Sequence, residues 1–162
     1  MLLACILIVV SRTVTTGPGG VWDIGYHVVW CPKYRRPVLV GDVAVRCEEL
    51  IREKSDEHGW RIIALEIMPD HIHLFVKTRP KDSPSFVANQ FKGFTSRTLR
   101  SEFPSLKSRL PTLWSRSYFV ASVGAVSADT VQRYIDTQYE RPWRKGDRSR
   151  YEPCVVVDFL TI

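Results

Sequence analysis

The sequence predicts an α+β fold with a ferredoxin-like (RRM-like) arrangement, in which helices cover one face of an antiparallel sheet. Apolar residues follow strand and helix periodicities in the order strand, helix, strand, strand, helix, strand, with one further helix at the end. A short turn joins the two middle strands, which predicts an antiparallel pair because parallel strands need a longer connection. The 162 residues suffice for one domain with a modest core.

Residues 1–20 are expected to lie outside the main domain. The apolar run from Leu2 to Val10 is shorter than the roughly 20 residues that cross a bilayer. It also lacks the flanking residues of a secretory signal, so an extra strand or a start codon placed too far upstream explains it better. Gly-Pro-Gly-Gly at 17–20 marks the start of the main domain, which we expect over 21–150, followed by a tail at 151–162.

The first half of the domain contains three expected strands and one helix. Residues 24–30 alternate with a period of two, which predicts a strand, and a basic turn follows between Pro32 and Pro37. Asp42 can cap the first helix, which Gly59 should end. Residues 61–67 and 71–78 predict two antiparallel strands joined by a turn at 68–70.

The second half contains two expected helices and one strand. Ser83 and Pro84 form a strong helix start, and Pro104 should end that helix. Residues 118–123 predict the fourth strand. Ser127 can cap a last helix that continues to Tyr139 and stops before Pro142.

His71 and His73 form the main chemical signal. Alternation along a strand places both imidazoles on one face, about 7 Å apart along the backbone, while Ile72 points into the core. Two imidazoles on one face can bind one divalent ion, although an isolated His-x-His pair is more often solvent-facing or hydrogen-bonded. Two histidines are too few for a closed zinc site, so further ligands must come from elsewhere.

The last helix offers the missing groups. Tyr134 and Gln138 are four residues apart and therefore share a helical face. A tyrosine and a glutamine on a helix are by themselves unremarkable surface residues. Beside the His-x-His strand, however, Gln138 provides a carbonyl oxygen as a third ligand and Tyr134 a phenol one turn away. Imidazole, amide oxygen and substrate oxygen together suit Mg²⁺ or Mn²⁺.

The phenol of Tyr134 is a weak nucleophile, since an unperturbed tyrosine has a pKa of about 10. A metal that polarises a non-bridging phosphate oxygen makes the phosphorus more electrophilic. The product would be a phosphotyrosine ester that stores the energy of the broken bond for later rejoining.

Basic clusters favour a polyanionic partner. The chain carries 23 Lys and Arg against 17 Asp and Glu, a net charge of +6. Cations beside aromatic rings suit single-stranded nucleic acid, although charged outer faces of helices are routine and Trp114 can equally belong to the core. The candidate contacts are Lys33, Tyr34, Arg35, Arg36, Lys92, Arg97, Arg100, Trp114 and Arg116.

Several motifs in one order resemble the single-tyrosine HUH transposases of the insertion sequence 200/605 class. The resemblance extends from about Tyr26 to Arg144. It rests on Tyr-His-Val-Val-Trp-Cys-Pro-Lys-Tyr-Arg-Arg-Pro, Met-Pro-Asp-His-Ile-His-Leu-Phe-Val, Gln-Phe-Lys-Gly-Phe-Thr-Ser-Arg, Leu-Trp-Ser-Arg-Ser-Tyr-Phe-Val and Tyr134-x-x-x-Gln138.

The resemblance implies that His71, His73 and Gln138 bind the metal and that Tyr134 is the nucleophile on a C-terminal catalytic helix. It implies cleavage of single-stranded DNA at hairpin-bearing element ends, with a 5′-phosphotyrosine and a free 3′-hydroxyl. It also implies a homodimer in which the tyrosine helix of one subunit can complete the metal site of the other. We expect no membrane segment and a cytoplasmic location, which suits four isolated cysteines.

Three alternatives are also compatible with the sequence. A domesticated tyrosine transposase would process scattered palindromic hairpins with the same chemistry. A non-catalytic module that binds single-stranded nucleic acid would explain the charge but not His71, His73, Tyr134 and Gln138. A metal-dependent hydrolase would use water in place of Tyr134.

Overall fold

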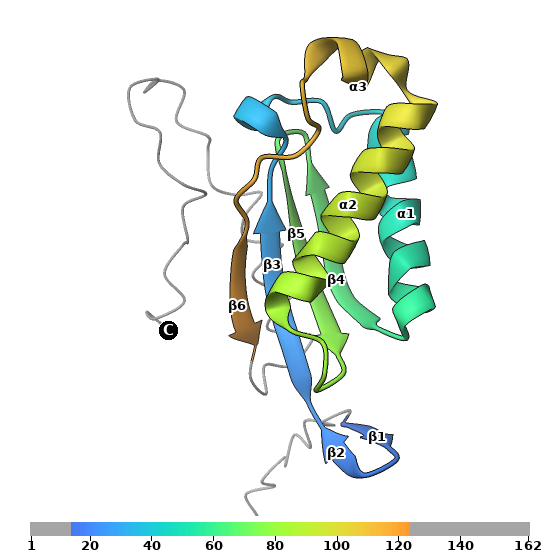
Figure 1. Ribbon diagram of the computed structural model, residues 1–162, viewed down its shortest axis with the longest axis vertical. Helices are drawn as coiled ribbons and strands as arrows, with labels where there is room; N and C mark the ends of the chain where they lie inside the picture. Colours follow the sequence, from blue (N-terminus) through green and yellow to red (C-terminus); the bar gives the residue numbers. More distant parts are fainter. Residues whose placement is uncertain (1–13, 124–162) are drawn as a thin grey trace, which may run out of the picture.

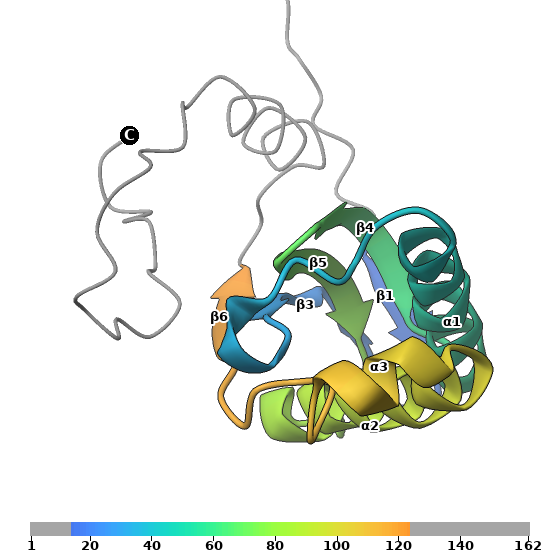
Figure 2. The ribbon, with the colours of Figure 1, turned by 90° about the horizontal axis from the view of Figure 1, so that it is seen from above.

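A four-stranded antiparallel sheet forms the centre of the molecule in the computed structural model, which describes residues 14–123. The strands are β3 (Ile24–Trp30), β4 (Arg61–Met68), β5 (His71–Thr78) and β6 (Phe119–Val123), in the spatial order β4-β5-β3-β6. Helices α1 (Asp42–His58) and α2 (Pro84–Glu102) lie side by side on one face (Figures 1 and 2). The predicted antiparallel sheet with helices on one face is therefore confirmed.

The helix ends follow local chemistry, with one correction. Gly59 ends α1 in the left-handed conformation at φ 66°, and Ser83 caps α2 by accepting a hydrogen bond from the Phe86 amide at 3.2 Å. Asp42 was expected to cap α1, but Gly41 occupies that position without a side-chain bond. Asp42 is instead the first helical residue, where its negative charge interacts favourably with the positive end of the helix dipole.

Pro104 follows the end of one helix and begins another. After α2 stops at Glu102, Pro104 begins the short helix α3 (Pro104–Arg109), which the sequence pattern did not predict. Proline fits there because the first turn of a helix needs no amide hydrogen from it. The α3 segment then leads through Leu110 and Leu113, both buried, to β6.

A small hairpin precedes the sheet. Strands β1 (Thr15–Gly17) and β2 (Gly20–Trp22) pair with each other and form a separate two-stranded sheet at the start of β3 (Figure 1). Gly19 makes the turn with φ 91°, a conformation that side chains disfavour. The expected domain start at residue 21 falls inside this hairpin.

The core lies between the sheet and the helices. Trp30 and Phe91 are fully buried and stack at 6.3 Å between ring centroids, which joins β3 to α2. Residues on the opposite face of β3 and β5 are buried as well, with His27 at 4% and Phe75 at 2% exposure. Burial therefore extends to these two positions on the face that the helices leave uncovered.

Several predictions concern residues outside the described part. These are the N-terminal run from Leu2 to Val10, the last helix with Tyr134 and Gln138, and the tail at 151–162. Within residues 14–123, no helix is both long enough and apolar enough to cross a membrane. The same part contains two buried thiols, Cys31 and Cys47, and no disulfide.

Candidate metal and DNA site

Strand β5 begins with the two histidines of the predicted pair. In the antiparallel register His71 lies opposite Met68, and His73 lies between Glu66 on β4 and Val29 on β3. Their side chains share the face of the sheet that α1 and α2 leave uncovered, since Ile72 between them is fully buried in the core. The alternation read from the sequence is observed.

The two imidazole rings are in contact. Their centroids lie 4.9 Å apart with the planes nearly perpendicular at 79°. His71 is hydrogen-bonded through Nδ1 to Asp70 Oδ1 at 2.6 Å, and His73 through Nδ1 to His27 Nε2 at 3.1 Å. Within residues 14–123 the Nε2 atoms of both rings make no hydrogen bond, so both are available as metal ligands.

Asp70 connects the pair to the basic turn. Its second oxygen, Oδ2, accepts a hydrogen bond from Arg35 at 3.0 Å. Burial alone would raise the pKa of the Asp70 carboxyl, but hydrogen bonds and charges from His71 and Arg35 outweigh it and lower that pKa. Asp70 is therefore an anion that can orient His71.

Burial keeps two of the histidines neutral. It lowers the pKa of His27 to about 4, and together with the charges of His71 and His27 it lowers the pKa of His73 to about 3. A neutral imidazole carries the lone pair that a metal requires. The state of His73 at neutral pH thus fits a metal ligand.

The described residues include two of the three ligands predicted for a metal site, His71 and His73. Two imidazole nitrogens fit a divalent ion, but residues 14–123 contain no group of three His, Cys, Asp or Glu that could hold one. Glu66 lies opposite His73 and is 7% exposed, which places a carboxylate on the same face. The predicted third ligand Gln138 and the predicted nucleophile Tyr134 lie outside the described part.

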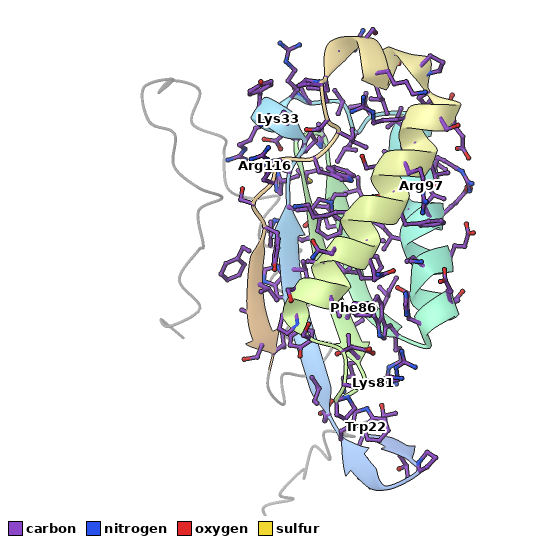
Figure 3. All side chains as sticks on the ribbon, viewed as in Figure 1. Trp22, Lys33, Lys81, Phe86, Arg97 and Arg116 are labelled. Atoms are coloured by element: carbon purple, nitrogen blue, oxygen red, sulfur yellow. The ribbon has the colours of Figure 1, made fainter. Side chains whose placement is uncertain are left out.

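The basic turn lies at the end of the sheet where β5 begins. The short 3₁₀ turn η1 (Lys33–Arg35) is held by hydrogen bonds to the segment before β6, from Lys33 N to Leu113 O at 2.8 Å and from Ser115 N to Cys31 O at 3.0 Å. Lys33 and Arg116 consequently lie near each other at this end (Figure 3).

Tyr34 is exposed on this turn. Its side chain is 63% exposed, and the Lys33 ammonium lies 5.1 Å from its ring centroid. Tyr34 and Arg35 both adopt positive φ, at 62° and 49°, which is costly for residues with a side chain. Arg35 and Arg36 are exposed next to it.

Two of the residues expected to contact DNA are buried and make hydrogen bonds within the protein. Lys92 was expected on the outside of its helix but is buried, and its ammonium donates to the carbonyl oxygens of Arg116 and Ser117 at 3.1 Å. Trp114 belongs to the core, with its indole donating to Thr95 Oγ1 at 3.0 Å. Both side chains therefore make contacts within the protein.

The remaining candidates lie apart from the histidines. Arg97 is exposed on the helical layer, away from Lys33 and Arg116 (Figure 3). Arg100 donates to the carbonyl oxygen of Pro111 at 2.9 Å. The structure thus separates the basic residues into those at the histidine end of the sheet and those on the helices.

Sequence reasoning did not identify Asp70 and His27 as parts of the site. Asp70 could have been found, because a carboxylate directly before His-x-His can reach the first imidazole. His27 gave only a weak signal as a histidine within an otherwise apolar strand. Its contact with His73 depends on strand pairing, which the pattern does not specify.

Fold and site together define a basic ferredoxin-like protein with two adjacent histidines beside a cationic turn. The family model described as "Transposase IS200 like" matches residues 20–138. The chain belongs to this family, and it is therefore a transposase of the kind found in mobile DNA elements.

Relatives agree with this assignment. The chain is 36% identical over 128 residues to the ISDra2 transposase TnpA of Deinococcus radiodurans, covering 77% of this chain and 91% of the relative. It is 34% identical over 121 residues to the transposase for insertion sequence element IS200 of Salmonella typhimurium, covering 74% and 79%.

Solved structures share the fold. A crystal structure of a candidate transposase from Deinococcus radiodurans has a TM-score of 0.63 at 34% identity, covering 76% of this chain and 97% of that chain. A REP-associated tyrosine transposase bound to a REP hairpin has a TM-score of 0.50 at 14% identity, covering 73% and 68%. The second likeness concerns the fold alone.

Proposed function

We propose that this transposase cleaves and rejoins single-stranded DNA through a 5′-phosphotyrosine at Tyr134, assisted by Mg²⁺ or Mn²⁺ at His71, His73 and Gln138. The observation that carries the proposal is the contact between the His71 and His73 rings, each with Nδ1 engaged and Nε2 available. Histidines that ligate metals commonly have their second nitrogen held in this way.

The reaction exchanges one phosphodiester for another. The phenol oxygen of Tyr134 attacks the scissile phosphorus, and the bond to the 3′ oxygen breaks. The leaving oxygen takes a proton and becomes a 3′-hydroxyl, while the 5′ phosphate stays on the tyrosine. A bound divalent ion would supply the charge that polarises a non-bridging oxygen. His71 and His73 would hold that charge at the end of the sheet.

The DNA partner is proposed to be a single strand with hairpins at the element ends. Lys33, Arg35, Arg36 and Arg116 would contact phosphates, and Tyr34 would stack on a base. All five lie on the two segments that meet beside the start of β5. The REP-associated transposase with the same fold was solved with a hairpin, which supports this partner.

The assembly and location extend the proposal. A homodimer would allow the tyrosine helix of one subunit to complete the site of the other. The proposed location of the protein is the cytoplasm. A mixed dimer with His71→Ala in one subunit and Tyr134→Phe in the other distinguishes a site completed in cis from one completed in trans. Only the trans arrangement brings an intact histidine pair and an intact Tyr134 together in one site, so only that arrangement should become covalently crosslinked to DNA.

An adduct assay tests the function. Incubation with Mg²⁺ and a hairpin-bearing single strand should give a covalent protein–DNA product, which Tyr134→Phe abolishes and His71→Ala abolishes while hairpin binding is retained. Tyr118→Phe and His58→Ala are matched controls that should keep the product, since neither residue lies among the proposed catalytic groups.

The alternatives give different products. A hydrolase would release cleaved ends and stay active as Tyr134→Phe, and a binding module would give neither cleavage nor adduct. Normal cleavage by His71→Ala would show that the metal assignment is wrong. A domesticated enzyme would form the same adduct, but its hairpin targets would be scattered through the genome and not flank the gene.

A further inference from the structure

His27 lies on the face of the sheet that carries the histidine pair, yet the proposed function gives it no role. In the register of β3 and β5, His27 is opposite Phe75, and His73 is opposite Val29, the next position on the same face. His27 and His73 are thus diagonal neighbours across two adjacent strands, which aromatic side chains can bridge. The two side chains are 4% and 9% exposed.

The contact between these rings has the geometry of an in-plane hydrogen bond. His27 Nε2 lies 3.1 Å from His73 Nδ1, with the centroids 5.3 Å apart and only 16° between the planes. Phe75 stacks on His27 at 4.1 Å and 3°, and Phe119 meets it edge-on at 6.0 Å. These aromatic rings restrict the rotation of His27 and therefore hold its Nε2 on His73.

One hydrogen must lie between the two nitrogens. If His27 donates it, the His73 hydrogen is on Nε2 and that ring cannot ligate a metal. If His73 donates from Nδ1, His27 accepts and His73 keeps its lone pair on Nε2. Binding of a metal through His73 Nε2 therefore requires His27 to be the acceptor.

We propose that His27 is a positioning residue of the metal site, which accepts the Nδ1 hydrogen of His73 and thereby directs His73 Nε2 toward the ion. The inference rests on the proposed metal site of His71 and His73. It explains why a polar ring occupies a buried position surrounded by aromatic side chains, where an apolar ring would cost less without such a role. Asp70 has the equivalent place beside His71.

Metal affinity measured without DNA tests the proposal. Mn²⁺ binding to the purified full chain is followed by electron paramagnetic resonance. His27→Phe keeps a ring that can stack on Phe75 but removes the acceptor, and it should weaken Mn²⁺ binding about 10-fold or more. His27→Gln offers an amide oxygen in its place and should recover most of the affinity.

A matched control is His58→Phe. His58 also stacks on an aromatic ring, Trp60, at 4.3 Å and 15°, but it lies at the end of α1. Its replacement should leave Mn²⁺ affinity unchanged. A folded His27→Phe protein with wild-type affinity would overturn the proposal.

Two further measurements complete the test. In the wild-type protein saturated with Mg²⁺, ¹⁵N–¹H correlation spectra should show His73 with its hydrogen on Nδ1, and a hydrogen on Nε2 would overturn the proposal even if His27→Phe did not fold. His71→Ala should lose Mn²⁺ binding. If His71→Ala binds Mn²⁺ normally, the metal site itself is wrong. If only His27→Phe binds normally, His27 alone has been misassigned.

Discussion

The side chains around the histidine pair differ in the kind of partner that holds them. His71 is held by the carboxylate of Asp70 from the preceding turn, which is itself bonded to Arg35. His73 is held by the neutral ring of His27 from the adjacent strand. The partners of His71 extend to the surface, since Arg35 is exposed, whereas the contact between His27 and His73 is buried.

Acid should destabilise the protein before its carboxylates titrate. The folded-state pKa values of His27 and His73, about 4 and about 3, lie below the unfolded value of 6.5. Unfolded chains therefore bind protons first as the pH falls, and stability present above about 6.5 is lost toward about 4. The expected loss is on the order of 1.4 kcal/mol per pH unit for each imidazole.

Urea unfolding of the metal-free protein at pH 7, 5.5 and 4.5 measures how steeply the free energy of unfolding falls with pH. His27→Phe should show a shallower dependence on pH than the wild type, because one buried imidazole is missing. Equal slopes for the wild type and His27→Phe would contradict the assigned burial effect.

At the scale of elements, helix α2 holds the segment that leads into β6. The Lys92 ammonium bonds two carbonyl oxygens of that segment and lies 5.2 Å from the centroid of Tyr118. Thr95 on the same helix accepts the hydrogen bond of Trp114. The helical layer thereby positions the loop that carries Arg116 beside the basic turn.

Lys92→Met should lower stability rather than DNA affinity. The methionine keeps the apolar stem but leaves the two carbonyls without their cation, which should cost about 1.5–3 kcal/mol of unfolding free energy. Lys81→Met is the control, because Lys81 is exposed and should change stability by less than about 0.5 kcal/mol. A fully stable Lys92→Met protein with weakened hairpin binding would instead support the direct DNA contact.

At the scale of the whole molecule, the two layers divide the basic residues. Lys33 and Arg116 lie at the end of the sheet where the histidines begin, whereas Arg97 lies on the helices (Figure 3). A DNA strand whose phosphate is bound at His71 and His73 would follow the first group. The net charge of +6 alone does not distinguish these surfaces.

Arg116→Ala and Arg97→Ala form a matched pair of exposed arginines. Arg116→Ala should weaken hairpin binding and reduce the slope of log affinity against log salt by about 0.7, the value for one lost phosphate contact on a single strand. Arg97→Ala should leave the slope unchanged. Titrations by fluorescence anisotropy between 50 and 200 mM salt (about a fourfold range) measure both. Equal effects would contradict the placement of the DNA.

Much of the fold was predictable because its elements carry local signals. The strand at 24–30, Gly59 as a helix end and Ser83 as a cap each depend on nearby residues, and each was predicted from them. Helix α3 was missed because Pro104 can equally end one helix or begin another, and the choice depends on how Leu106 packs into the core. Lys92 was misplaced because its carbonyl partners are 24 and 25 residues away.

The amino-acid sequence by itself determined the order of strands and helices, the shared face of His71 and His73, and the membership in a transposase family. These depend on periodicity and on motifs of neighbouring residues. Only the tertiary structure decided that His27 reaches His73, that Lys92 and Trp114 are buried, and that Arg116 lies near Lys33. Strand pairing and layer packing set such contacts, because they join residues whose separation along the chain carries no information about their distance in space.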